Sequence, residues 1–159
     1  MDLNKFTDKA RTIIQDAQTL AITSNHQRLT TEHLLYALIK DESQITDRLI
    51  EYCQGNIYGV ENEIELELKK HPMVSGSGAG QLIMDPELAR TLEKAQVLAR
   101  EVGDSFVTIE RLLHGILALS NSVASNILVK NGVTLQKILL AIDKLRQGRT
   151  ADTATSENN

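Results

Sequence analysis

The sequence predicts an all-α fold of eight helices, arranged as two four-helix repeats related by a pseudo-twofold axis. Apolar residues recur at the three- and four-residue spacing of amphipathic helices along most of the chain. No stretch alternates polar and apolar residues as a half-buried strand does. Blocks of the first half also recur in the second half at one spacing, which indicates an internal duplication.

The duplication is read from several matches in the same order. Ala17, in DAQTLA, aligns with Ala95, in KAQVLA, 78 residues later. The same offset carries TTEHLLYALI (30–39) onto TIERLLHGIL (108–117) without a gap. After a one-residue slip, which aligns Gly55 with Gly132, the offset of 78 returns. Chance does not readily supply several ordered blocks at one spacing, so we expect two copies of one helical unit.

The first repeat, residues 1–72, is predicted to contain four helices. An apolar stripe from Phe6 to Ala21 defines the first helix. Thr30 is a suitable N-cap for the second, with Glu32 in its first turn, and Gly55 stands where the third helix should end. The predicted ranges are 7–24, 31–40, 44–53 and 58–70.

The second repeat, residues 85–148, follows the same plan. Asp85-Pro86-Glu87 is typical of a helix start, because Asp caps, Pro suits the first position and Glu favours the positive end of the dipole. Thr108 is a suitable cap for the second helix, and Gly132 ends the third. The predicted ranges are 85–102, 108–119, 123–131 and 134–147.

Two segments lie outside the repeats. Residues 73–84 are predicted to be a flexible tether, because Gly and Ser fill SGSGAG at 75–80. This stretch lacks the Lys-Ser/Thr of a phosphate-binding loop and follows no apolar strand, so it predicts no nucleotide site. The small polar residues at 149–159 predict a disordered tail or the start of a linker.

The composition limits the protein class and its partners. Hydrophobic residues make up 42% and aromatic residues 3%, so the core must be aliphatic. A net charge of −4 argues against a nucleic-acid partner, and no apolar run approaches the roughly 20 residues that span a bilayer. The polar N-terminus is unlike a secretory signal, and the single Cys53 forms no internal disulfide; we expect a cytoplasmic location.

No catalytic or metal-binding constellation is found. His26, His33, His71 and His114 contain no i, i+4 pair and no HExxH, and the predicted helices scatter them. Solvent-facing or capping roles are therefore expected for the histidines. Cys53 has no CxxC partner and falls on an apolar helix face, which predicts a small core residue. We expect no enzyme activity, no metal and no cofactor, and favour a binding module whose seam between repeats holds an apolar groove.

Three features resemble a known family: the opening MDLNKFTDKA, the paired TTEHLLYAL and TIERLLHGIL blocks, and HPMVSGSGAGQLIMDPEL followed by GDSFVTIERLL. Together they resemble the N-terminal Clp repeat domain of ClpB-type disaggregases. The resemblance covers nearly all of residues 1–148. The duplicated pattern is shared with the ClpA and ClpC relatives, whereas LNKFT and VSGSGAGQL are similar to ClpB in particular.

The resemblance implies an all-α domain that binds exposed segments of unfolded or aggregated polypeptides before a hexameric ATP-driven ring threads them, in cooperation with the DnaK chaperone system. ATP and Mg would belong to ATPase modules beyond residue 159, and 149–159 would begin the linker to them. The domain itself contains no Walker A motif. The resemblance further implies a stress-response chaperone that is cytoplasmic, a monomeric isolated domain in a homohexameric parent, and no membrane or nucleic-acid partner.

The resemblance also implies polar substrate-binding residues. Thr7 in KFTDK, Asp104 in GDSF and Glu110 in TIERLL match positions that handle substrate in the family. Each has a structural alternative as well. Thr7 can cap the first helix, Asp104 can stabilise a turn, and Glu110 can complement a helix dipole.

The apolar groove of the family is matched by Leu92, Val107 and Ile109. Arg111 is a departure, because ClpB sequences often place a hydrophobic residue or His after the residue equivalent to Glu110, and it leaves the apolar extent of the groove open. The alternative function is an adaptor-docking or regulatory domain, as in ClpA- and ClpC-type unfoldases, whose partner would be a folded protein bound through a polar surface.

Overall fold

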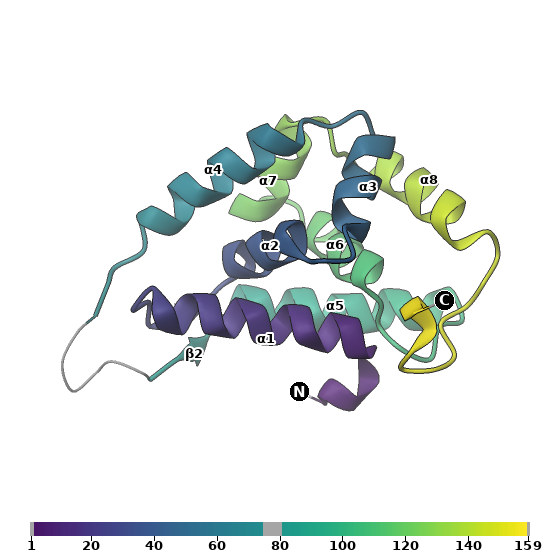
Figure 1. Cartoon of the computed structure of the whole chain (residues 1–159), viewed down its shortest axis with the longest axis horizontal. Coiled ribbons are helices and arrows are strands. Elements are labelled where there is room, and N and C mark those ends of the chain that lie inside the picture. Colours follow the sequence, from purple (N-terminus) through teal and green to yellow (C-terminus); the bar gives the residue numbers. More distant parts are fainter. Residues whose placement is uncertain (1, 75–80, 159) are drawn as a thin grey trace.

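The computed structural model describes residues 2–74 and 81–158, and within them eight α-helices form the fold (Figure 1). Every predicted helix is present, and each predicted end lies within one residue of the observed end. The helices are α1 (Asp8–Thr23), α2 (Thr31–Lys40), α3 (Ile45–Tyr52), α4 (Ile57–Lys69), α5 (Pro86–Glu101), α6 (Ile109–Ala118), α7 (Val123–Lys130) and α8 (Leu135–Arg146). The all-α prediction is therefore confirmed.

Short elements that the sequence analysis did not predict complete the described chain. Two 3-10 turns, Leu3–Lys5 and Ser156–Asn158, lie near its two ends. Two strands of two residues each, β1 (Arg28–Leu29) and β2 (Ile83–Met84), pair in parallel. Strands this short leave no polar–apolar alternation to detect in a sequence.

Backbone pairing joins the two repeats at equivalent positions. Leu29 pairs with Met84 in the small sheet, and Phe6 pairs with Val107 in an isolated parallel bridge. Phe6 and Met84 are 78 residues apart, as are Leu29 and Val107. In both cases the segment before the first helix of one repeat pairs with the segment before the second helix of the other. The pseudo-twofold thus relates two intertwined units, each completed by its neighbour.

The second helix of each repeat lies at the centre of the molecule. In Figure 1, α1 and α5 both lie on one side of α2 and α6, and the remaining four helices lie on the other side. Eight of the ten residues of α2 and nine of the ten of α6 are buried. Among the buried residues of α6 are Glu110, Arg111 and His114, so these polar side chains must find partners inside the protein.

Threonine caps begin the helices that bound the candidate site. Thr7 Oγ1 accepts a hydrogen bond from the Ala10 amide at 3.2 Å, and Thr108 Oγ1 accepts one from the Arg111 amide at 3.3 Å. At Thr30 the backbone amide donates to His33 Nδ1 at 3.0 Å, so histidine fills the place that Glu or Gln takes in a capping box. The predicted caps at Thr30 and Thr108 are confirmed.

Gly55 and Gly132 meet where the two repeats contact each other. Gly132 has a φ of +91°, as a helix-ending glycine should, whereas in the first repeat Gln54 takes the left-handed conformation with a φ of +60°. Gly55 is required for a different reason. A Cβ there would lie 2.7 Å from Val133 Cγ2 and 3.1 Å from the Asn131 carbonyl oxygen.

Near their starts, the tether and the C-terminal segment each form backbone hydrogen bonds with a repeat. Residues 75–80, the centre of the predicted tether, lie outside the described part of the chain. Before them Met73 pairs with His26, and after them β2 joins the sheet. The C-terminal segment differs from the disordered tail that its composition predicts. Ala151 is fully buried, and its carbonyl oxygen accepts a hydrogen bond from the Ser105 amide at 2.9 Å.

Ala151 lies 78 residues after Met73, and Asp104 lies 78 residues after His26. The chain after α8 therefore folds back on its repeat as the chain after α4 does. Its role as the start of a linker stays a prediction. Among the described residues no single helix is long and apolar enough to cross a membrane; only α6 with α7, a pair bent by 98° at its break, passes on length and composition.

Replacing Gly55 with alanine should destabilise the contact between the repeats. The added methyl group meets backbone and side-chain atoms of the loop after α7, so we expect the free energy of unfolding to fall by ~1–3 kcal/mol, measured by guanidinium denaturation. Gly148→Ala is the comparison: it has open space but a φ of +83°, and should lose about 1 kcal/mol through conformation alone. A Gly55→Ala variant as stable as the wild type would contradict this close packing.

Candidate functional site

Five of the six residues predicted to bind substrate lie together, where the N-termini of α1 and α6 meet. The Thr7 amide donates to the Val107 carbonyl at 2.9 Å, which joins the start of α1 to the segment before α6. Hydrogen bonds from Arg146 connect Asp104 with Glu110, and hydrogen bonds to Glu157 connect Thr7 with Ile109. The five are Thr7, Asp104, Val107, Ile109 and Glu110. The sixth, Leu92, lies in α5 as part of the hydrophobic core.

All six predicted residues are buried, with exposed fractions from 0% to 5%. Leu92, Val107 and Ile109 pack in the core and do not line an open groove in this structure. The three side chains are covered in this structure, and the apolar groove that they are expected to line stays a prediction. Their contact with a substrate stays a prediction, which requires part of this covering to move.

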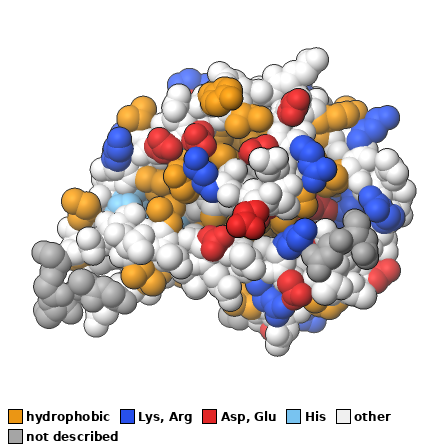
Figure 2. Space-filling model, in the orientation of Figure 1, with side chains coloured by type: hydrophobic (Ala, Val, Ile, Leu, Met, Phe, Trp, Pro, Cys, Tyr) orange, Lys and Arg blue, Asp and Glu red, His pale blue; other side chains and the backbone are white. Residues whose placement is uncertain are grey.

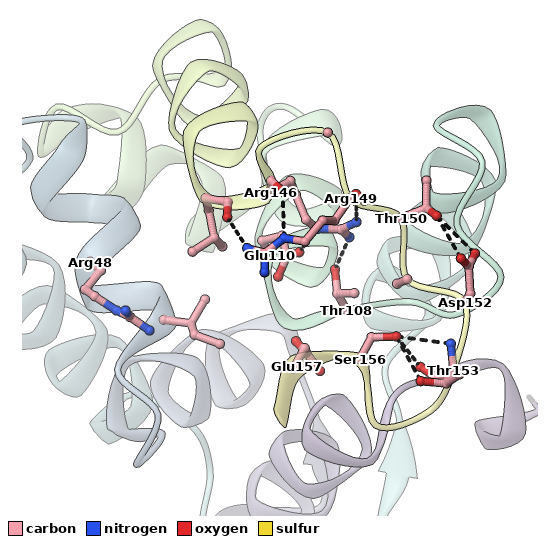
Figure 3. Close-up of a pocket in the computed structure, with 14 residues that line it drawn as sticks. Arg48, Thr108, Glu110, Arg146, Arg149, Thr150, Asp152, Thr153, Ser156 and Glu157 are labelled. Atoms are coloured by element: carbon pink, nitrogen blue, oxygen red, sulfur yellow. Dashed lines mark hydrogen bonds and ion pairs between the residues drawn. The ribbon is translucent and has the colours of Figure 1, made fainter. Parts of the chain in front are cut away.

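Arg146, at the end of α8, organises the polar half of the site. Its guanidinium donates to both carboxylate oxygens of Asp104, at 3.0 and 2.7 Å. It also donates to Glu110 Oε1 and to Thr108 Oγ1, the latter at 3.0 Å (Figure 3). The Asp104 side chain is fully buried and that of Glu110 is 3% exposed. A planar five-donor guanidinium can serve several acceptors at once, as an ammonium cannot.

The charges of this network support one another. Burial acts to raise the pKa of Asp104, but hydrogen bonds from Arg146 and the Ala151 amide outweigh it and hold that pKa below its usual range. The pKa of Arg146 is raised because the favourable hydrogen bonds and charges of Asp104 and Glu110 exceed the cost of burial. Both carboxylates are therefore paired, as buried carboxylates must be.

Arg111, the departure from the family pattern, is also buried. Its Nη1 lies 3.1 Å from His114 Nδ1, and its Nε has no hydrogen-bond partner. Burial, followed by repulsion from Arg146, lowers the pKa of Arg111. Burial and Arg111 lower the pKa of His114 to about 4, so His114 is neutral and accepts from the guanidinium. Arg111 therefore lies inside the protein and does not interrupt an exposed apolar surface.

Glu157 of the C-terminal segment fills the space between the two helix N-termini. Its carboxylate accepts hydrogen bonds from the Thr7 hydroxyl and, at 2.7 Å, from the Ile109 amide. Burial raises the pKa of Glu157 to about 7, against these hydrogen bonds. Because the folded chain binds this proton more tightly than the unfolded chain, the contact contributes to the free energy of unfolding. That contribution is complete below the ordinary pKa of a Glu carboxyl group and is lost as the pH rises through 7.

A pocket of about 680 Å³ lies beside this network, between the two repeats (Figure 3). One wall is formed by α3, with Ile45 and Arg48, and another by α8, with Leu145 and Arg146. The C-terminal segment closes the third side with residues 148–153, Ser156 and Glu157. The pocket combines the aliphatic side chains of Ile45 and Leu145 with charged groups of both signs.

Three of the four histidines lie together, contrary to the prediction that they are scattered. The ring centroids of His26, His33 and His71 are 5.1 to 5.2 Å apart. His26 Nδ1 is 2.9 Å from His33 Nε2, and His71 Nε2 is 3.4 Å from Glu32 Oε1. The turn after α1 and the chain after α4 bring the rings to the start of α2, which helical spacing alone does not show.

These histidines do not form a metal centre. In the part of the chain that the structure describes, no group of three or more His, Cys, Asp or Glu side chains could hold a metal ion. The two facing nitrogens of His26 and His33 are within hydrogen-bond distance and serve each other. Cys53 is buried, and burial raises the pKa of its thiol, which is consistent with the predicted core residue and unsuited to a nucleophile.

Two residues of the site were missed by the sequence analysis. Arg146 looked like an ordinary cation in the last turn of a helix, and Glu157 lay in a segment with a disordered composition. The available signal for Arg146 was indirect: Glu110 stands in a helix whose neighbours are apolar, so it needed a cationic partner from elsewhere. Nothing in the sequence pointed to Glu157.

Arg146→Ala should strongly destabilise the protein. The substitution leaves Asp104 and Glu110 buried without a counter-charge, so the free energy of unfolding should fall by about 3 kcal/mol in a denaturant titration. Arg146→Lys should recover only part of this loss, because an ammonium cannot serve all three partners. Arg149→Ala is the matched control, since Arg149 is exposed and donates only to backbone carbonyls. Equal stability of Arg146→Ala and Arg149→Ala would contradict the network.

The histidine cluster should make the protein less stable in acid. Burial, with repulsion from His71 and His26, lowers the pKa of His33 to about 3, so the unfolded chain binds a proton that the folded chain does not. The contribution of neutral His33 to the free energy of unfolding is complete above pH 6.5. It declines as the pH falls, by up to about 1.4 kcal/mol per pH unit for one proton. His33→Asn, whose Oδ1 can still accept from the Thr30 amide, should lose stability less steeply between pH 7.5 and 5. Parallel pH profiles of unfolding midpoints would refute this assignment.

Comparison with known proteins places this architecture in a family. The Clp repeat (R) N-terminal domain family matches residues 5–131. The chaperone protein ClpB of Mesorhizobium japonicum is 42% identical over 159 residues, and that of Rhodopseudomonas palustris is 43% identical over 158 residues. These matches cover 100% and 99% of this chain but only 18% of each relative.

Solved structures show the same fold. The Hsp104 N-terminal domain from Candida albicans matches with a TM-score of 0.80 at 23% identity, covering 94% of this chain and 97% of that one. The N-terminal domain of the ClpV1 ATPase from E. coli matches with a TM-score of 0.77 at 16% identity, covering 91% and 88%. Since the family match spans most of the sequence and the ClpB relatives align over all of it, the chain belongs to the Clp repeat N-terminal domain family.

Proposed function

We propose that this chain is the substrate-engaging N-terminal domain of a ClpB-type protein disaggregase. The observation that carries the proposal is the identity of about 40% with ClpB chaperones along the entire chain. The proposed ligand is an exposed segment of an unfolded or aggregated polypeptide. The bound segment would then pass to a ring that threads it.

The rest of the proposed machine lies outside this chain, which spans 18% of the length of its ClpB relatives. We place ATP and Mg in ATPase modules of the parent protein, which is proposed to be a homohexamer in the cytoplasm that works with the DnaK system. The domain itself is proposed to bind and not to catalyse. The grouping of Thr7, Asp104 and Glu110 at one place supports a shared role for them.

Binding by this domain is proposed to be weak and mainly apolar. Ile45 and Leu145 give the pocket beside the junction of α1 and α6 its apolar part, and Figure 2 shows further apolar side chains among charged ones on one face of the molecule. Burial of apolar surface supplies about 25 cal/mol per Å², and several tethered copies in one ring would add avidity. Weak contacts suit the task, because the substrate must leave the domain to be threaded.

Titration with a permanently unfolded protein tests the proposal. Reduced, carboxymethylated α-lactalbumin should shift the methyl NMR signals of Leu92, Val107 and Ile109, because binding at the junction of α1 and α6 must disturb the side chains beneath it. Native α-lactalbumin is the control and should cause no shifts. Silence at these three methyl groups, with shifts elsewhere, would reject this site.

The same titration at two ionic strengths separates the proposal from the adaptor-docking alternative. Apolar binding should change little between 50 and 300 mM salt, whereas docking through a charged surface weakens steeply as charges are screened. A steep loss of affinity would favour a ClpA- or ClpC-type regulatory role.

A further inference from the structure

The C-terminal segment, residues 150–157, crosses the start of α1 and α6 in the manner of a bound peptide. At its first anchor, Ala151 is fully buried, its amide donates to Asp104 Oδ1 at 2.9 Å, and its carbonyl accepts from the Ser105 amide at 2.9 Å. Both backbone groups of Ala151 are thus held by the domain. The side chain contributes only a methyl group, so any small residue would fit this anchor.

The second anchor satisfies the free amides at the two helix N-termini. The Asp8 amide, the first of α1, donates to the Ala154 carbonyl at 2.8 Å. The Ile109 amide, the first of α6, donates to the Glu157 carboxylate at 2.7 Å, and the Thr7 hydroxyl donates to the same group. Such amides have no partner within their own helix, and they favour an anionic acceptor. The Glu157 carboxyl group occupies this anchor and accepts from both helix starts, although its burial opposes the charged form.

Two further hydrogen bonds join the segment to the domain: the Phe106 amide also donates to the Ala151 carbonyl at 3.2 Å, and Lys9 Nζ donates to the Glu157 carbonyl at 3.2 Å. Asp152, Thr153 and Thr155, between the anchors, are exposed, and Ala151 is its only fully buried residue. Segments with few buried apolar contacts open at low free-energy cost, so this one can detach without unfolding the helices. Detachment would uncover Thr7, Asp104 and Ile109, which are among the residues proposed to bind substrate.

We infer that residues 150–157 are an intramolecular competitor for polypeptide binding. The surface that they cover is a peptide site for an extended segment of a client, with a small residue at the Ala151 anchor and an acidic residue six positions later at the Glu157 anchor. Backbone hydrogen bonds would hold either occupant, since they are available to any extended chain. This inference rests on the proposed function, because it assumes that clients bind at the junction of α1 and α6.

Two substitutions at opposite ends of the segment test the inference in the full chain. Glu157→Ala removes the carboxylate, and Ala151→Arg cannot fit the buried anchor. Asp152→Ala is the matched control, because it removes the same charge from an exposed position of the same segment. Amide hydrogen exchange reports detachment: exchange of Asp8 should accelerate in both variants, exchange of Leu113 inside α6 should not, and Asp152→Ala should resemble the wild type.

Client binding is then measured with reduced, carboxymethylated α-lactalbumin. The apparent affinity for the client is proportional to the fraction of molecules whose site is free of the C-terminal segment. It should therefore rise by up to roughly ten-fold in Glu157→Ala and Ala151→Arg, and stay unchanged in Asp152→Ala. On Ala151→Arg, a peptide of residues 149–158 should displace the client, and the same peptide with Ala in place of Glu157 should not. Equal displacement by both peptides would overturn the acidic preference.

Other outcomes separate the two proposals. If exchange at Asp8 accelerates while client affinity is the same in all four proteins, the segment is no competitor, although client binding stands. Unchanged exchange in both variants would also overturn the inference, because the anchors would not be holding the segment. If neither the wild type nor any variant binds the unfolded protein, the proposed function itself fails.

Discussion

The structure depends on the burial of two helices that each carry a carboxylate in the first turn. α2 and α6 lie at the centre of the molecule, and the carboxylates Glu32 and Glu110 occupy equivalent positions in their first turns. A buried carboxylate needs a partner, and in both repeats the partner comes from the end of the fourth helix or just beyond it. His71 lies 3.4 Å from Glu32, and Arg146 pairs with Glu110. This requirement holds the end of each repeat against its own centre.

The two repeats meet that requirement with different chemistry. The first uses a cluster of imidazoles, in which burial lowers the pKa of His26 and of His33. In the second, Asp104 and Arg111 stand at the positions equivalent to His26 and His33, and a charged network replaces the imidazoles. Duplication thus produced one end built on imidazoles and one built on an Arg–carboxylate network. The Arg–carboxylate end is the one that holds the C-terminal segment and the polar residues that we propose bind substrate.

Intertwining explains why the site lies at a junction. Each repeat lends its first segment to the other, through the pairing of Phe6 with Val107 and of Leu29 with Met84. The start of α1, from the first repeat, is therefore placed beside the start of α6, from the second. Two helix N-termini then point at one place, and the Glu157 carboxyl group of the C-terminal segment accepts hydrogen bonds from the Thr7 hydroxyl and the Ile109 amide. Neither repeat could form this arrangement alone.

The helices, their ends, the duplication and the family could all be predicted from the sequence, because helical periodicity, Thr and Asp caps and a constant offset are local or repeated signals. The polar site residues could be named only through a resemblance, and the apolar ones, expected to line a groove, are covered in this structure. Arg146, Glu157 and the histidine cluster were decided by tertiary structure alone. Their partners lie 36 or more residues away for Arg146 and Glu157, and for the histidines the chain after α4 has to return to the start of α2. Such contacts depend on how helices turn back on one another, which residue spacing does not record.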